Sequence, residues 1–132
     1  MRIDWSQSLE TGNPDLDTDH RTLVDIINRL ELPADHNDSE IGKILCDLID
    51  YVIVHFGREE ELMRRYRYPS VDTHMLAHCQ FFTTLIGYSY SFETGSGGLS
   101  GPMQDYLGQW LLDHESTEDK GLAAYLGACQ PE

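Results

Sequence analysis

The chain has 132 residues, with nine Lys and Arg against 23 Asp and Glu, which gives a formal net charge of −14. A single domain of this length can bury a hydrophobic core without cross-links. The negative charge excludes unaided binding to nucleic acid or to an anionic membrane, because like charges repel. Three cysteines without a C-x-x-C spacing, and no apolar run of the roughly 20 residues that span a bilayer, predict a protein of the reducing cytoplasm.

The first predicted element is an irregular arm over residues 1–16, where a Gly-Asn-Pro sequence interrupts any regular pattern. A first helix follows and ends at Pro33, with Asp17 or Thr18 as its N-terminal cap. Its apolar residues recur at steps of three and four, which is the period of one helix face.

Two long helices are predicted next. One begins near Asp38 and runs to about Arg65, where the sequence Tyr68-Pro69-Ser70 breaks it. The other carries apolar residues at helical spacing as far as about Phe92.

The clearest loop follows at 93–101, which holds four glycines in nine residues. Pro102 fits the first turn of a fourth helix, and a short final helix is expected at about 119–126. Four amphipathic helices with short connections predict an all-α fold, an antiparallel up-down four-helix bundle. We expect a single domain, with the arm at 1–16, the bundle at about 17–116 and a C-terminal segment at about 117–132.

Polar side chains stand on the helix stripes that should face the bundle core. Five of the six histidines do so, with at least one in each of the four helices: His20, His55, His74, His78 and His114. The sixth, His36, falls in a predicted loop, and Glu59 shares the inner stripe of the second helix. A buried carboxylate is costly unless it is neutralised, and metal ions in the bundle core would neutralise it.

The spacing within two helices lets pairs of these residues share one site. His55 and Glu59 are four residues apart, and so are His74 and His78. Residues four apart differ by only about 40° around a helix, so each pair lies on one face.

A third pair is less simple. Asp119 follows His114 by five residues, which is about 140° around an ideal helix. Both can reach one site only if the helix ends or bends between them. Ser116 and Thr117 mark a place where it could, because both residue types favour caps over helix interiors.

Seven candidate ligands exceed the four of a tetrahedral zinc site, whereas two metals bridged by two carboxylates would use them all. Imidazole with carboxylate suits iron or manganese better than Cu(I), and the lack of a cysteine motif argues against an iron–sulfur cluster. Hydrogen-bonded core histidines are the alternative. They do not explain why inward histidines occur on four separate helices.

The chain resembles the bacterial hemerythrins in several segments: Trp5 to Gly12, Asp17 to Leu23, His55 to Met63, Tyr68-Pro69, His74 to His78, Trp110 to His114, and Asp119-Lys120. The resemblance extends from Trp5 to about Leu126. It implies two iron ions joined by an oxo or hydroxo bridge, with O2 or peroxide as the exogenous ligand.

The resemblance also implies which residues hold the metals. The seven implied ligands are His20, His55, Glu59, His74, His78, His114 and Asp119. The last three histidines would hold one iron. The first two would hold the other, which keeps an open position for O2, and the two carboxylates would bridge the pair.

Two residues depart from the family pattern. Asp19 stands where the family usually has Gln, and we expect it to lie behind the ligands or to face solvent. Glu115 replaces a bulky apolar residue, often Ile, that packs over the O2 site. Glu115 either faces solvent at the end of a helix or points into the pocket. In the pocket it would ligate the two-histidine iron or exchange protons with the bound ligand.

Two functions follow from this sequence. The first is O2 binding for storage, delivery or sensing. The alternative is a di-iron peroxidase or oxidase with Glu115 as its candidate catalytic residue. We expect O2 as the small-molecule ligand and no nucleic-acid or membrane partner. Any signal would have to pass through a separate polypeptide, because 132 residues leave no room for an output domain, and a separate reductase is a further candidate partner.

Overall fold

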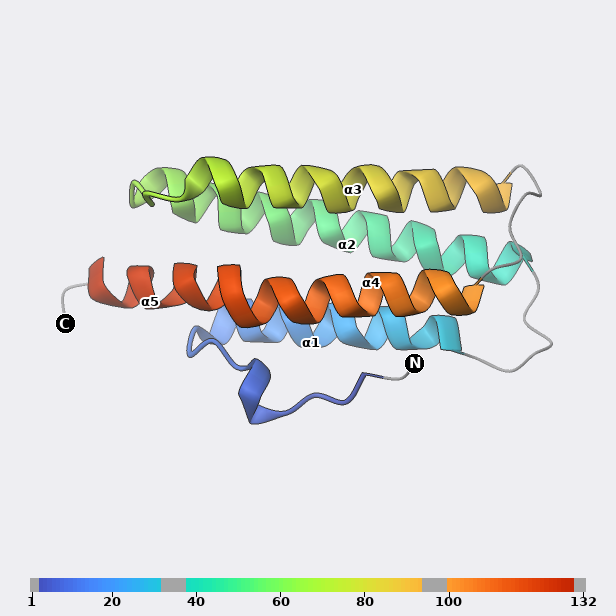
Figure 1. Ribbon diagram of the computed structural model, residues 1–132, viewed down its shortest axis with the longest axis horizontal. Helices are drawn as coiled ribbons and strands as arrows, with labels where there is room; N and C mark the ends of the chain where they lie inside the picture. Colours follow the sequence, from blue (N-terminus) through green and yellow to red (C-terminus); the bar gives the residue numbers. More distant parts are fainter. Residues whose placement is uncertain (1–2, 32–37, 94–99, 130–132) are drawn as a thin grey trace.

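The computed structural model describes residues 3–31, 38–93 and 100–129 (Figure 1). Within these ranges every regular element is a helix. The long helices are α1 (Pro14–Asn28), α2 (Asp38–Arg65), α3 (Val71–Glu93), α4 (Ser100–His114) and α5 (Lys120–Cys129). Two short 3₁₀ turns are η1 (Gln7–Leu9) and η2 (Arg29–Glu31), and a π-helical turn is η3 (Glu115–Asp119).

Figure 1 shows α1, α2, α3 and α4 side by side, each antiparallel to the one before it in the chain. The predicted all-α four-helix bundle is therefore confirmed. The second and third helices have the predicted extents to within a residue. His36 and most of the glycine-rich loop lie outside the described residues.

The hydrophobic core runs along the inside of the bundle and comes from all four helices. Its fully buried members include Leu23, Ile27, Leu45, Leu48, Phe81, Leu85 and Leu107. A second, smaller cluster of Met63, Leu122 and Leu126 closes the other end of the bundle. The inward histidines and carboxylates lie between these two clusters, as a polar layer in an otherwise apolar interior.

The start of α1 differs from the prediction. Asn13 is the cap, and its side chain accepts hydrogen bonds from two backbone N–H groups of the first turn, while Pro14 occupies the first helical position. The expected cap at Asp17 or Thr18 was wrong. Asp17 instead accepts hydrogen bonds from the backbone N–H and the hydroxyl of Thr11, both at 2.8 Å, and so ties the arm to the helix.

The N-terminal arm packs against α1 and α4. The backbone of Ile3 is paired with the side chain of Asn28 by two hydrogen bonds of 2.8 and 2.7 Å. The side chain of Ile3 fills the space over Gly108, where an added Cβ would lie 2.8 Å from Cδ1 of Ile3. Glycine at this position therefore allows the arm to approach α4 closely.

The fourth helix continues through η3 into α5 without a break in direction (Figure 1). A π-helical turn holds more residues per turn than an α-helix, so η3 widens the helix without ending it. The hydroxyls of Ser116 and Thr117 donate to the carbonyl oxygen of Asp113 at 3.2 and 2.6 Å. The predicted irregularity between His114 and Asp119 thus has the form of a wider turn, and α5 packs as the end of the fourth helix.

Candidate metal centre

All seven predicted ligands lie in the polar layer of the bundle, and none is more than 5% exposed: His20, His55, Glu59, His74, His78, His114 and Asp119. They come from α1, α2, α3, α4 and η3. The structure therefore brings together residues that are almost 100 positions apart in the chain.

Their ligand atoms form two groups, and within each group all the atoms lie within 4.8 Å of one another. The three-histidine cluster consists of Glu59, His74, His78, His114 and Asp119. The two-histidine cluster consists of His20, His55, Glu59 and Asp119. The two carboxylates belong to both clusters.

Asp119 divides its oxygens between the clusters. Its Oδ1 lies 3.0 Å from Nε2 of His74 and 3.0 Å from Nε2 of His114. Its Oδ2 lies 2.8 Å from Nε2 of His20. The π-helical turn makes this possible, because it brings Asp119 onto the face of His114.

The two oxygens of Glu59 also face different clusters. Its Oε1 faces the three-histidine cluster, 3.0 Å from Nε2 of His78 and 3.5 Å from Nε2 of His74. Its Oε2 faces the two-histidine cluster, 3.5 Å from Nε2 of His55 and 3.7 Å from Nε2 of His20. Each of the two carboxylates thus directs one oxygen to each cluster.

The contacts within the clusters do not satisfy these polar atoms. Among the described residues, both oxygens of Glu59 and Asp119 and Nε2 of His20 and His74 are buried without a hydrogen-bond partner. Nitrogen and oxygen atoms about 3 Å apart that do not form hydrogen bonds suit a shared cation, which would accept their lone pairs. The donor set therefore fits a pair of metal ions.

Electrostatics in the metal-free protein supports the same conclusion. Burial lowers the pKa of His20, but Asp119 and Glu59 outweigh it and raise that pKa to about 10. The same two carboxylates overcome burial to raise the pKa of His74 to about 9. Burial and Asp119 raise the pKa of Glu59, yet the surrounding histidines lower it to about 2. Protons thus balance the buried carboxylates, and a metal ion must displace them to bind.

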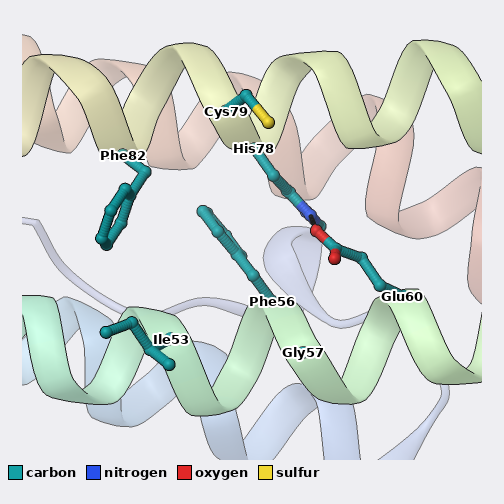
Figure 2. A pocket seen from close by; sticks show the side chains of 7 residues that line it. All are labelled: Ile53, Phe56, Gly57, Glu60, His78, Cys79 and Phe82. Atoms are coloured by element: carbon teal, nitrogen blue, oxygen red, sulfur yellow. Dashed lines mark hydrogen bonds and ion pairs between the residues drawn. The ribbon is translucent and has the colours of Figure 1, made fainter.

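Three of the five histidines also contact a carboxylate through the other ring nitrogen. The pairs are His55 Nδ1 with Asp19 at 2.8 Å, His78 Nδ1 with Glu60 at 3.1 Å, and His114 Nδ1 with Glu118 at 2.8 Å. Figure 2 shows His78 and Glu60 meeting between α3 and α2. A carboxylate at Nδ1 keeps the proton on that nitrogen and leaves the lone pair of Nε2 for a metal.

Of the two positions expected for Asp19, the structure has the one behind a predicted ligand, His55, and the solvent-facing alternative was wrong, since Asp19 is 3% exposed. Arg58 donates to both of its oxygens at 3.0 Å, and the Tyr51 hydroxyl donates to it at 3.1 Å. Burial opposes ionisation of Asp19, but His55, Tyr51 and Arg58 together lower its pKa. Asp19 is therefore a fixed negative charge behind a predicted ligand.

The sequence reasoning missed Glu60 and Glu118. Glu118 stands four residues after His114, so the spacing rule that paired His55 with Glu59 would have found it. Glu60 reaches His78 from the facing helix, and no local spacing connects residues 18 positions apart.

Aromatic rings pack against the three-histidine cluster. Phe56 stacks on His78 with ring centroids 3.7 Å apart, and Trp110 stacks on His114 at 4.5 Å. In Figure 2 the Phe56 ring forms one wall of a groove of about 240 Å³ between α2 and α3. The rings hold the two imidazoles in place and cover them with apolar surface.

Glu115 is fully buried, so the solvent-facing alternative was wrong. Its Oε1 lies 3.9 Å from Nδ1 of His20, on the ring edge opposite the one that faces Asp119. It belongs to neither ligand cluster. Burial is the main cause that raises the pKa of Glu115 to about 8, and Asp119 and Glu59 add to it against the opposing effect of His20.

A comparison with protein families matches residues 11–126 to the hemerythrin HHE cation binding domain. The chain belongs to the hemerythrin family. The bacteriohemerythrin of Methylococcus capsulatus (strain ATCC 33009 / NCIMB 11132 / Bath) is 32% identical over 105 residues, which cover 79% of this chain and 80% of that protein. The bacteriohemerythrin of Stenotrophomonas maltophilia (strain R551-3) is 28% identical over 120 residues, covering 90% and 78% of the two chains.

Solved structures agree with this assignment. A crystal structure of wild-type hemerythrin superposes with a TM-score of 0.88 at 29% identity, covering 96% of this chain and 98% of that one. The predicted family and fold are thereby confirmed. As a hemerythrin with a cluster of potential metal ligands, the chain is a metal-binding protein that binds O2. In the parts of the chain that the structure describes, no helix has the length and apolar character needed to cross a membrane.

Proposed function

We propose that this hemerythrin holds two iron ions joined by an oxo or hydroxo bridge, and that it binds O2 reversibly at the two-histidine iron for storage, delivery or sensing. One observation carries the proposal. Glu59 and Asp119 each direct one oxygen to the three-histidine cluster and the other to the two-histidine cluster. Carboxylates that direct their two oxygens to different clusters suit two metals, because a single metal would use only one oxygen of each.

The number of donors indicates where an exogenous ligand would bind. The three-histidine cluster offers five donor residues and the two-histidine cluster offers four. With a shared bridging oxygen added, an octahedral metal would be complete in the first cluster and one ligand short in the second. The open position therefore belongs to the metal held by His20 and His55.

Two ferrous ions would supply the two electrons that O2 takes up on binding and returns on release. The protein itself contributes position and exclusion of water. Asp19 and Glu60 keep two of the imidazoles in the tautomer that leaves Nε2 free, and Glu118 lies 2.8 Å from Nδ1 of a third, His114. The apolar clusters on either side of the polar layer keep bulk water from the site.

The decisive experiment is anaerobic reconstitution with Fe(II), followed by optical spectroscopy on addition of O2. We expect two iron ions per chain and a ligand-to-metal charge-transfer band that appears with O2 and vanishes on deoxygenation. One iron per chain, or a band that does not reverse, would contradict the proposal.

Glu115 supports a second candidate, a di-iron peroxidase or oxidase. It is a buried acid next to His20, a predicted ligand of the metal that would bind O2. In that case the protein should reduce peroxide with a reducing dye, and Glu115→Ile should abolish the turnover and lengthen the lifetime of the O2 adduct. An unchanged lifetime would count against the enzyme.

We further propose that the protein works in the cytoplasm with a separate reductase or signalling polypeptide. Its three cysteines, Cys46, Cys79 and Cys129, are all free, in keeping with a reducing compartment. Co-purification from a cytoplasmic fraction under anaerobic conditions, followed by identification of bound polypeptides, tests both statements.

A further inference from the structure

The Nδ1 atoms of the five histidines have unequal surroundings. Those of His55, His78 and His114 each meet a carboxylate within about 3 Å. Among the described residues, those of His20 and His74 are buried without a hydrogen-bond partner. A ligand imidazole almost always donates its second N–H, so both positions need an explanation.

Glu115 provides one for His20. Both of its oxygens are buried without a hydrogen-bond partner among the described residues, and Oε1 is 3.9 Å from Nδ1 of His20. The opposite ring nitrogen, Nε2, lies 2.8 Å from Asp119 in the two-histidine cluster. The imidazole of His20 therefore stands between the metal-facing carboxylates and Glu115.

We infer that Glu115 is the positioning residue of His20, accepting a hydrogen bond from its Nδ1–H when Nε2 binds a metal. The inference rests on the proposed function, because it requires a metal in the two-histidine cluster. In this role Glu115 contacts the ligand His20 and does not itself bind the metal.

The chemistry of a bound imidazole supports this role. An imidazole whose Nε2 binds a cation keeps its proton on Nδ1, and the cation makes that N–H a stronger donor. The carboxylate must approach by about 1 Å to reach the 2.7–2.9 Å of a charge-assisted hydrogen bond. The N–H and the charge of the nearby cation would then offset the desolvation of the Glu115 carboxylate, which is otherwise fully buried.

His74 supplies a contrast within the same protein. Like Glu115 and His20, it is buried, but no carboxylate contacts its Nδ1 among the described residues, and the ring of Tyr68 lies 6.4 Å away between centroids. The five histidines therefore include three with close carboxylates, one with Glu115, and one with none.

The test uses the whole protein loaded with Co(II), whose ligand histidines give well-resolved, shifted ring N–H signals in proton NMR. Three variants are compared with the wild type: Glu115→Gln, which keeps an acceptor oxygen, Glu115→Leu, which removes it, and Glu61→Leu, a matched control on the exposed face of α2. Competition with a chelator gives the affinity of each metal.

We expect Glu115→Leu to shift the His20 N–H signal or to lose it through exchange with solvent. We also expect it to weaken the metal of the two-histidine cluster by about 10- to 100-fold. Glu115→Gln should restore the signal and most of the affinity. The three-histidine metal, retained in every variant, shows that the bundle is folded.

An unchanged His20 N–H signal and unchanged affinity in Glu115→Leu would overturn the inference. A crystal structure with metal in which a Glu115 oxygen binds the metal would do so too. The proposed function fails differently, through a wild type that holds fewer than two metals or shows no reversible O2 spectrum. If two metals bind but O2 does not leave, the NMR result still decides the role of Glu115.

Discussion

The two clusters share Glu59 and Asp119, yet they differ in what lies behind their histidines. In the three-histidine cluster the outer carboxylates, Glu60 and Glu118, have side chains that are 21% and 33% exposed. In the two-histidine cluster the side chains of the corresponding acids, Asp19 and Glu115, are 5% and 0% exposed.

Their packing differs as well. Phe56 and Trp110 stack directly on His78 and His114, whereas His20 meets the neighbouring His55 edge to face at 4.9 Å. Charges near the protein surface are screened by solvent, and buried ones are not. The three-histidine cluster is therefore held mainly by ring packing, and the two-histidine cluster by buried charge.

The largest effect is expected from a substitution of Glu59, a carboxylate that both clusters share. Glu59→Gln should weaken both metals by more than about 100-fold, because an amide offers one oxygen where the carboxylate offers two. Elemental analysis after anaerobic iron loading and desalting measures the metals per chain. Glu61→Gln, the same change on the exposed side of α2, should keep both metals. Two metals in Glu59→Gln would show that this carboxylate does not bridge.

The next experiment compares the two clusters by replacing an acid that lies behind a histidine in each of them. Asp19→Asn should weaken the two-histidine metal by about 10- to 100-fold, because it removes a buried charge that also pairs with Arg58. Glu60→Gln should weaken the three-histidine metal by less than about 10-fold, because solvent replaces part of what it supplies. Chelator competition measures both constants, and equal losses would refute the distinction.

A separate effect concerns pH and the stability of the metal-free protein. The pKa of Glu115 is raised from 4.5 to about 8, so the folded state keeps a proton that the unfolded chain releases. Glu115 therefore costs stability increasingly as pH rises from 4.5 to 8. Glu115→Gln, which cannot ionise, should have an unfolding free energy within about 1 kcal/mol of the wild type at pH 5 and about 4 kcal/mol above it at pH 8.

Urea denaturation of chelator-treated protein at both pH values measures this difference. Glu61→Gln serves as the control for a glutamate at the surface. A gain that is equal at pH 5 and pH 8 would mean that the charge of Glu115 is not what the fold resists.

The smallest effect lies away from both clusters. The Tyr125 hydroxyl donates to the carbonyl oxygens of Tyr66 and Arg67 at 2.7 and 3.1 Å, and so fastens α5 to the turn between α2 and α3. Tyr125→Phe should lower the midpoint of urea denaturation slightly and leave the metal content unchanged. A loss of metal in this variant would show that the clusters respond to any loosening of the bundle.

Much of this arrangement is predictable from sequence, because it follows from helical periodicity. His55 with Glu59, and His74 with His78, lie on one face by spacing alone, and the breaks at Pro33 and Tyr68-Pro69-Ser70 separate the helices that carry them. The inward position of these polar residues was evident from the apolar residues that flank them on the same stripes.

The remainder depends on geometry that spacing does not fix. The direction of the Glu115 side chain changes with the kind of turn that contains it, and sequence periodicity assumes an α-helix. The contacts of Asp19 with His55 and of Glu60 with His78 join different helices, so their existence depends on how the helices are rotated against each other. Asn13 became the cap because Pro14 opens the helix earlier than the apolar pattern suggested.

The π-helical turn also makes the protein sensitive to the deletion of a single residue. Deleting a single residue within Glu115–Asp119 would restore an ordinary α-helix and rotate everything beyond it by about 100°. Asp119 would leave the histidines, and in the same step Leu122 and Leu126 would turn away from Met63. The position of Asp119 among the histidines and the packing of Leu122 and Leu126 on Met63 therefore both depend on the number of residues in this turn. A chain with one residue fewer here would lose both.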